Sequence, residues 1–213
     1  MGLPMNTRTM SYALGLALII PIGGTLFRII EIAVTGNWAL AFDPEFVDRL
    51  PLFVHGLSMV AFLVLGAVQL SPKIRATRPK LHRTLGRMAG AGAILGGASG
   101  VWMTLLHLEI STPLLLLARL LFGTAMAAFT ILAIRAAIRR NFIEHRAWII
   151  RAYAIALNAG TFPIFYLPFV LIMGEPEPLI DEAFQVAGWM INLAVAEKFV
   201  IARSVHEESS DDT

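Results

Sequence analysis

The chain has 213 residues, of which 57% are hydrophobic and only 15% are charged, and its mean hydropathy is +0.71. A soluble domain carries about a quarter charged residues, so this composition excludes an ordinary soluble protein and predicts an all-α membrane bundle. The absence of cysteine excludes disulfides, thiolate metal sites and cysteine nucleophiles. The net charge of +2 is small and does not indicate a nucleic-acid partner.

Six apolar segments are each close to the roughly 20 residues that a helix needs to cross a bilayer. We expect residues 1–204 to form one transmembrane domain. The acidic residues 205–213 are expected to form a disordered tail. The predicted membrane spans are residues 10–33, 52–70, 85–107, 113–138, 147–173 and 183–203.

The charges of the connecting segments alternate in sign along the chain. Basic residues concentrate in 71–87 and 135–151, whereas the segments at the opposite ends of the spans are acidic, as in 43–48 and 175–182. Because basic loops remain in the cytoplasm, we expect both basic segments and both termini to be cytoplasmic. The same segments predict contact with anionic lipid headgroups.

Small residues recur at helical spacing in the third span and let helix backbones approach closely in lipid. They predict either a packing helix at the centre of one bundle or a face for a homo-oligomer or another membrane protein. In the fifth span, Pro163 and Pro168 should kink the helix, because each removes an i→i−4 hydrogen bond. The small residues form two parallel rows, Gly92, Gly96 and Gly100, and Ala89, Ala93 and Gly97.

Charged side chains inside the predicted spans are costly and need partners. On the outer side, Arg28 and Glu31 lie three residues apart, which favours a local ion pair. Arg119 lies about 10 Å along its helix from Pro113, too deep to reach water easily. We expect Glu31 to be its partner.

On the cytoplasmic side, Glu197 lies within the inner half of the last span. Arg87 or Arg151 is expected to neutralise it, because an unpaired carboxylate in lipid is unfavourable. Asn158 and Asn192 lie near mid-span and predict hydrogen bonds between helices.

Histidine is the strongest cofactor ligand in this cysteine-free chain. His55 and His107 lie near the outer face, and His82 and His145 lie at the inner face on different helices. One interpretation is that His82 and His145 hold haem b. The alternatives are that the histidines lie at the interface and bond to backbone or headgroups, or that they bind a divalent metal. The candidate cofactor-binding residues are His55, His82, His145, Arg83, Arg87, Arg146 and Arg151, with the arginines able to hold propionates or an anionic headgroup.

Two His-Arg segments, His82-Arg83 followed by Arg87 and His145-Arg146 followed by Arg151, together with several further residues, resemble the DUF2306 family of predicted membrane proteins over about residues 52–200. The resemblance implies a bacterial, multi-pass inner-membrane protein without an established activity. His107 falls outside the family pattern, and Ile149 or Ile150 stands where a methionine is usual. A likeness to cytochrome b561-type bundles rests on helix number and boundary histidines alone. The residues that carry the family resemblance are His55, Gln69, Arg75, Pro79, His82, Arg83, Leu85, Gly86, Arg87, His145, Arg146, Trp148, Ile150, Arg151, Tyr153, Ala154, Asn192, Ala196 and Glu197.

Three functions are compatible with these observations. The first is a redox protein that holds haem b and transfers electrons, and any enzymatic activity would then be that of a membrane oxidoreductase. The second is a non-catalytic subunit of a larger membrane complex. The third is a transporter of small solutes, which the absence of an evident inverted repeat disfavours.

Overall fold

The computed structural model describes residues 18–20, 22–23, 34, 46–106, 108 and 112–211, with the backbone alone for 46–49 and 199–211. The described chain is all-helical, as predicted. The predicted span 10–33 lies almost entirely outside the described residues, and Arg28, Glu31 and His107 lie outside them too. The helices are α2 (Phe46–Gln69), α3 (Pro72–Thr77), α4 (Pro79–Leu106), α5 (Pro113–Ile138), α6 (Phe142–Ala156), α7 (Asn158–Met173) and α8 (Pro178–Asp211).

Five helical segments of the described chain are long and apolar enough to cross a membrane. They agree with the last five predicted spans to within about six residues at either end. The fifth segment consists of two helices, α6 and α7. The segments are Leu50–Gln69, Pro79–Leu106, Pro113–Ile138, Phe142–Met173 and Pro178–Lys198.

Two helices begin earlier than the predicted spans, which places the His-Arg pairs inside helices and not at their boundaries. Helix α4 begins at Pro79, whose fixed φ suits the first helical position. Helix α6 begins after Asn141, whose side-chain oxygen accepts the Glu144 N–H at 3.1 Å. His82 and His145 are therefore both the fourth residue of their helices.

The fifth span is interrupted at Leu157, where α6 ends and α7 begins, and a kink at the two prolines stays a prediction. Pro163 and Pro168 both lie inside α7, so the break precedes the first proline by one to two helical turns. At the other end of the chain, α8 runs on to Asp211, through the segment expected to be a disordered tail. No proline or glycine follows Gly188, so nothing in the sequence stops that helix.

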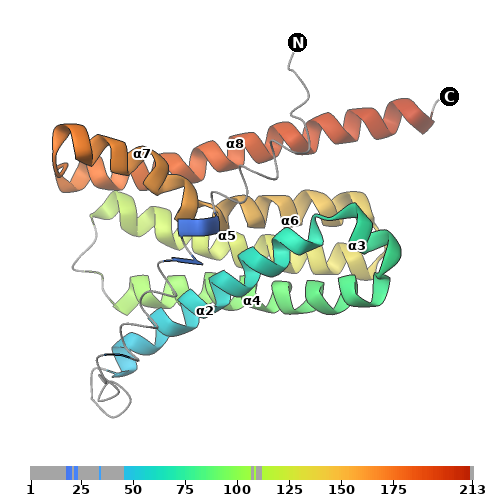
Figure 1. Cartoon of the computed structure of the whole chain (residues 1–213), viewed down its shortest axis with the longest axis horizontal. Helices are drawn as coiled ribbons and strands as arrows, with labels where there is room; N and C mark the ends of the chain where they lie inside the picture. Colours follow the sequence, from blue (N-terminus) through green and yellow to red (C-terminus); the bar gives the residue numbers. More distant parts are fainter. Residues whose placement is uncertain are drawn as a thin grey trace.

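Four helices form a ring in which each contacts the next: α2 packs on α4, α4 on α5, α5 on α6, and α6 on α2. Helices α4 and α6 therefore stand diagonally opposite each other. Figure 1 shows α4, α5 and α6 along the long axis, with α2 crossing α4 obliquely. Helix α8 packs on α6, and α7 packs mainly on α8. An aromatic cluster of Phe162, Tyr166, Phe169 and Phe184 joins α7 to α8.

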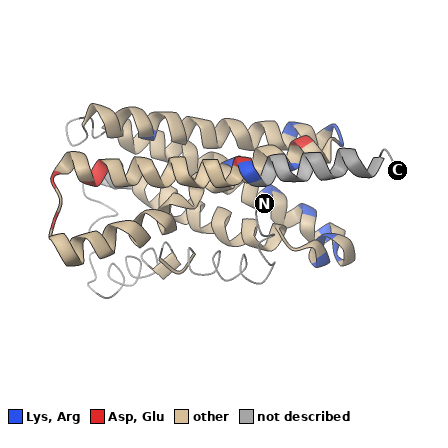
Figure 2. Ribbon diagram, turned by 90° about the horizontal axis from the view of Figure 1, so that it is seen from above, with Lys and Arg blue, Asp and Glu red and all other residues tan. Residues whose placement is uncertain are grey.

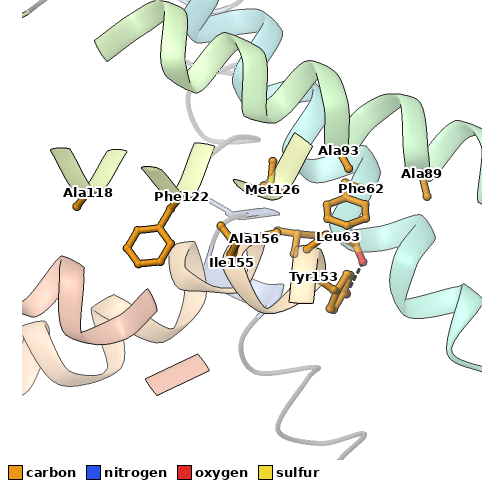
Figure 3. Close-up of a cluster of buried hydrophobic side chains, with 11 residues drawn as sticks. Phe62, Leu63, Ala89, Ala93, Ala118, Phe122, Met126, Tyr153, Ile155 and Ala156 are labelled. Carbon is orange, nitrogen blue, oxygen red and sulfur yellow. Dashed lines mark hydrogen bonds between the residues drawn. The ribbon is translucent and has the colours of Figure 1, made fainter. Parts of the chain in front are cut away.

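All four ring helices contribute to one buried core (Figure 3). In the core, the rings of Phe62 and Tyr153 meet edge to face with centroids 5.4 Å apart. The Tyr153 hydroxyl donates to the Leu63 carbonyl at 2.7 Å, which satisfies the polar end of a buried side chain. Leu18, from the first predicted span, packs against this core.

The two small-residue rows of α4 face two different neighbours. A Cβ at Gly92 would lie 2.9 Å from the Ser58 carbonyl oxygen of α2, and one at Gly97 would lie 2.6 Å from the Gly123 carbonyl oxygen of α5. The first row thus packs on α2 and the second on α5, which agrees with a central packing helix. The face considered for a homo-oligomer, Gly92, Gly96 and Gly100, is covered by α2 of the same chain.

Charged side chains are segregated along the bundle (Figure 2). Lysine and arginine gather where α2, α3 and α4 connect and where α5 joins α6; we call this the basic end. Glutamate and aspartate mark the opposite, acidic end, in the connection between α7 and α8. This separation corresponds to the alternation of charge on which the predicted orientation rests.

Candidate functional site

His82 and His145 occupy matching places in the ring of helices. On α4, His82 precedes Gly86, Ala89 and Ala93 at steps of four, three and four residues, which is the spacing of one helix face. Ala89 and Ala93 belong to the buried core. Each step places the next residue above the last on the same face, so His82 lies at the basic end of the core-facing stripe of α4.

Helix α6 repeats the same pattern. His145 precedes Ile149, Ala152 and Ala156 at the same three steps, and these residues belong to the core or pack against it. The two histidines therefore extend the interior of the ring from diagonally opposite helices. They are close enough for their charges to interact. They lie on different helices at the same end of the bundle, and the expectation that this end is at one face of the membrane stays a prediction.

Gln69 of α2 completes the group from a third helix. It follows Phe62 and Gly66 on the core-facing side of α2, and its amide oxygen would lie 3.1 Å from a Cβ at Gly86. Glycine at that position thus gives the amide room against α4, one turn from His82. We call Gln69, His82, His145 and the Ala133 carbonyl of α5 the polar layer.

Hydrogen bonding orients one histidine of the polar layer and not the other. His145 Nδ1 lies 2.9 Å from the Ala133 carbonyl oxygen, so Nδ1 carries the proton and donates. In the neutral ring this leaves Nε2 with its lone pair. His82 Nδ1 and Gln69 Nε2 are both buried, and neither has a hydrogen-bond partner in the described chain. Such atoms call for a ligand or a rearrangement, because an unpaired buried polar group is costly.

The predicted arginines surround this layer unequally. Arg75 and Arg83 lie close enough to act on the charge of His82. Arg83 and Arg87 are exposed, and Arg146 is half-buried. Within the described residues, no three histidine, aspartate or glutamate side chains gather to hold a metal ion. As ligands for a metal, the layer offers its two imidazoles.

The predicted partner of Glu197 is confirmed to be one of the two expected arginines, Arg151. Arg151 Nε lies 2.5 Å from Glu197 Oε1, and Nη2 lies 2.7 Å from Oε2, so two parallel bonds join α6 to α8. The Arg151 guanidinium also lies 4.9 Å from the centre of the Trp148 ring. Both members of the ion pair are satisfied, which argues for a structural role.

His55 is not part of the polar layer. Its Nδ1 lies 2.9 Å from the Gly96 carbonyl oxygen, and Gly100 leaves room for its ring. Gly96 stands about 21 Å along α4 from His82. His55 therefore ties α2 to α4 toward the acidic end, and its expected outer partner, His107, lies outside the described residues.

At the acidic end, Glu182 has a structural role, whereas the sequence indicated it only as one charge of the acidic segment 175–182. Glu182 is 5% exposed and accepts hydrogen bonds from the Thr112 hydroxyl and, at 3.1 Å, from the Thr112 N–H. Thr112 caps the N-terminus of α5, where a carboxylate is favourable. Glu182 and Asp181 also lie within electrostatic range of Arg119. The expected Arg119–Glu31 pair involves a residue outside the described part and stays a prediction.

Of the two mid-span asparagines, Asn158 belongs to α7 and Asn192 to α8. Asn158 Nδ2 donates to the Gln185 carbonyl at 3.2 Å, which confirms an interhelical bond. Its Oδ1 and Asn192 Nδ2 are buried and have no partner among the described residues.

Comparison with known proteins supports the classification from sequence. No curated protein and no solved structure matches the chain. The sequence profile described as "Predicted membrane protein (DUF2306)" matches residues 52–200, which include α3 to α7 and most of α2 and α8. The polar layer and the Arg151–Glu197 pair both lie within the matched region. The chain therefore belongs to the DUF2306 family of predicted membrane proteins.

Proposed function

We propose that this integral membrane protein is a redox protein whose polar layer binds haem b, with His82 and His145 as the residues that would hold its iron. The observation that supports it best is the equivalence of the two histidines. They end matching stripes on diagonally opposite helices at the same end of the bundle, within electrostatic range of each other. Bis-histidine haem in a helical bundle requires two imidazoles that project inward from facing helices.

The residues present fit such a group in two respects. A histidine that binds iron through Nε2 commonly donates its Nδ1 proton to a carbonyl or carboxylate, and His145 does so to Ala133. The arginines at the same end, of which Arg75 and Arg83 lie near His82, supply positive charge for carboxylate groups. When bound, haem would supply one-electron transfer, and the protein would hold its position and exclude water.

We place the protein in the bacterial inner membrane, with the polar layer at the cytoplasmic side. The support for this placement is the gathering of lysine and arginine at the basic end (Figure 2). Electrons would thus be exchanged at the inner face of the membrane.

A second candidate ligand is a quinone or another amphiphile with a carbonyl or carboxylate head. The specific observation in its favour is the pair of unpartnered nitrogens, His82 Nδ1 and Gln69 Nε2. Both can donate hydrogen bonds to one oxygen atom. This ligand requires the same layer but gives no haem absorbance.

The deciding experiment is a reduced-minus-oxidised spectrum of the full-length protein, purified in mild detergent from haem-replete cells. We expect Soret and α bands that disappear in His82→Ala and His145→Ala. His145→Met should retain haem with a shifted spectrum, because a thioether can replace imidazole on iron. His206→Ala is the matched control and should leave the spectrum unchanged.

The contrary result is a folded wild-type protein without haem bands. If solvent extraction of that sample then yields a quinone that is lost from Gln69→Leu, the second candidate is correct. Without either ligand, both proposals are wrong, and the histidines serve as interfacial anchors.

A further inference from the structure

The break between α6 and α7 places an amide group deep in the protein. Asn158, the first residue of α7, is 7% exposed, and its Nδ2 donates to the Gln185 carbonyl of α8. Its Oδ1 is buried and has no hydrogen-bond partner in the described chain. The Nδ2 group of Asn158 is therefore hydrogen-bonded, whereas its Oδ1 is a buried acceptor that has no donor among the described residues.

Gly188 of α8 fixes where that acceptor lies. A Cβ at Gly188 would overlap Asn158 Oδ1, so the amide oxygen rests directly on the backbone of α8 at this glycine. Gly188 is itself buried. Any larger residue at 188 would push Asn158 away from α8.

Asn192 stands one helical turn beyond Gly188 on the same side of α8. Side chains on a helix lean toward the preceding turn, so the Asn192 amide leans toward Gly188 and Asn158. Its Nδ2 is buried and, within the described residues, has no partner. An unpaired acceptor, which rests on Gly188, and an unpaired donor, on Asn192, thus lie one helical turn apart along α8.

Asn158 Oδ1 is a hydrogen-bond acceptor and the Asn192 Nδ2 group is a donor, and together they determine which ligand can bind here. An unpaired buried polar group is costly, and the hydrocarbon core of a bilayer supplies no bulk water to satisfy it. A cation would satisfy Asn158 Oδ1 but not the Asn192 N–H group, and an anion would do the reverse. A water molecule donates to one and accepts from the other.

We propose that an ordered water molecule bridges Asn158 Oδ1 and Asn192 Nδ2, forming a buried solvent site that fastens the start of α7 to α8. The site lies beside the helix break at Leu157, where the regular backbone pattern of the membrane-spanning segment is interrupted. It is separate from the polar layer and does not depend on haem or quinone binding.

The first test is an experimental structure of the full-length protein in lipid, at about 2 Å resolution or better, where waters with several hydrogen bonds are visible. The expected result is a solvent peak within hydrogen-bond distance of both amide groups. A direct bond between Asn158 and Asn192, or a site empty of solvent, would overturn the proposal.

The second test is independent of resolution. In protein with 15N-labelled asparagine side chains, the Asn192 amide protons should show a cross-peak to bound water. Asn158→Leu should remove that cross-peak. Gln185→Leu is the matched control and should retain it, because Asn158 bonds to the backbone of Gln185 and not to its side chain. Absence of the cross-peak from wild-type protein would contradict the bridging water.

Discussion

Arg151 of α6 and Glu197 of α8 form a two-point ion pair, with Nε to Oε1 at 2.5 Å and Nη2 to Oε2 at 2.7 Å. The planar fork of arginine matches the carboxylate, and the Trp148 ring covers the guanidinium. Trp148 in turn packs on Phe129 of α5. The pair therefore links α8 to α6 and, through Trp148, to α5 near the basic end of the bundle.

Changing either member of this ion pair should destabilise the protein. Glu197→Gln leaves a guanidinium without its counter-charge, and we expect the free energy of unfolding to fall by about 1–3 kcal/mol, since the pair is only partly buried. Arg151→Lys should also be unfavourable, because an ammonium cannot form the two parallel bonds.

The measurement is denaturant or thermal unfolding in mild detergent. Glu177→Gln, which removes an exposed carboxylate from the α7–α8 connection, is the control and should change the stability by less than about 0.5 kcal/mol. Equal losses in Glu197→Gln and Glu177→Gln would show that the pair adds nothing.

The sequence identified this ion pair only as one of two alternatives, and the structure shows why. The depth of Glu197 requires a basic partner, but Arg87 and Arg151 both lie at the right depth. The choice depends on which helix packs against α8. Helix α6 does so, and Arg87 lies on an exposed part of α4. Neighbour relations of this kind arise from tertiary packing, which a single sequence does not encode locally.

The polar layer was partly visible in the sequence. The four-three-four spacing of His82, Gly86, Ala89 and Ala93 recurs from His145 onward and marks both histidines as core-facing. The spacing could not reveal that α4 and α6 stand diagonally opposite each other in the ring of helices. Gln69 was quoted for the family resemblance alone, and its place in the layer depends on how α2 packs along α4, which brings the Gln69 amide against Gly86.

The glycines of α4 should differ in their tolerance to a methyl group. At Gly97 the added Cβ would meet the Gly123 backbone oxygen at 2.6 Å, and a backbone cannot move aside without separating α4 from α5. At Gly96 it would meet Met59 Sδ at 2.6 Å, and a methionine side chain can adopt another rotamer.

We therefore expect Gly97→Ala to lower the free energy of unfolding by about 1–3 kcal/mol and Gly96→Ala to cost less. Larger residues should be worse at both positions, so Gly96→Leu should reduce the yield of folded protein. Unfolding midpoints and gel-filtration profiles of the three variants provide the comparison. A Gly97→Ala protein as stable as wild type would mean that α4 and α5 are not in close contact.

Glu182 should matter for stability more than any exposed acid of the acidic end. In Glu182→Ala, the Thr112 N–H and hydroxyl lose their acceptor and Arg119 loses a nearby negative charge. We expect a loss of about 2–4 kcal/mol, typical of removing one member of a buried polar contact. Glu182→Gln should lose less, because an amide oxygen can still accept from Thr112.

The comparison requires both variants in the same unfolding assay, with Glu175→Gln as an exposed control. The order expected is a large loss for alanine, a smaller loss for glutamine and little change for the control. If alanine and glutamine are equally tolerated, the carboxylate does not hold α8 to the start of α5.

The orientation of the bundle is the prediction that most directly tests the charge pattern. Both connections at the basic end should be cytoplasmic, and the α7–α8 connection should be outside, because moving several arginines across a bilayer is unfavourable. A fluorescent protein fused after Asp212 should then be bright. Alkaline phosphatase fused at the same position should be inactive, whereas a fusion after Glu175 should be active. The reverse pattern would move the polar layer and its proposed ligand to the outer face, since His82 and His145 share an end with these basic connections.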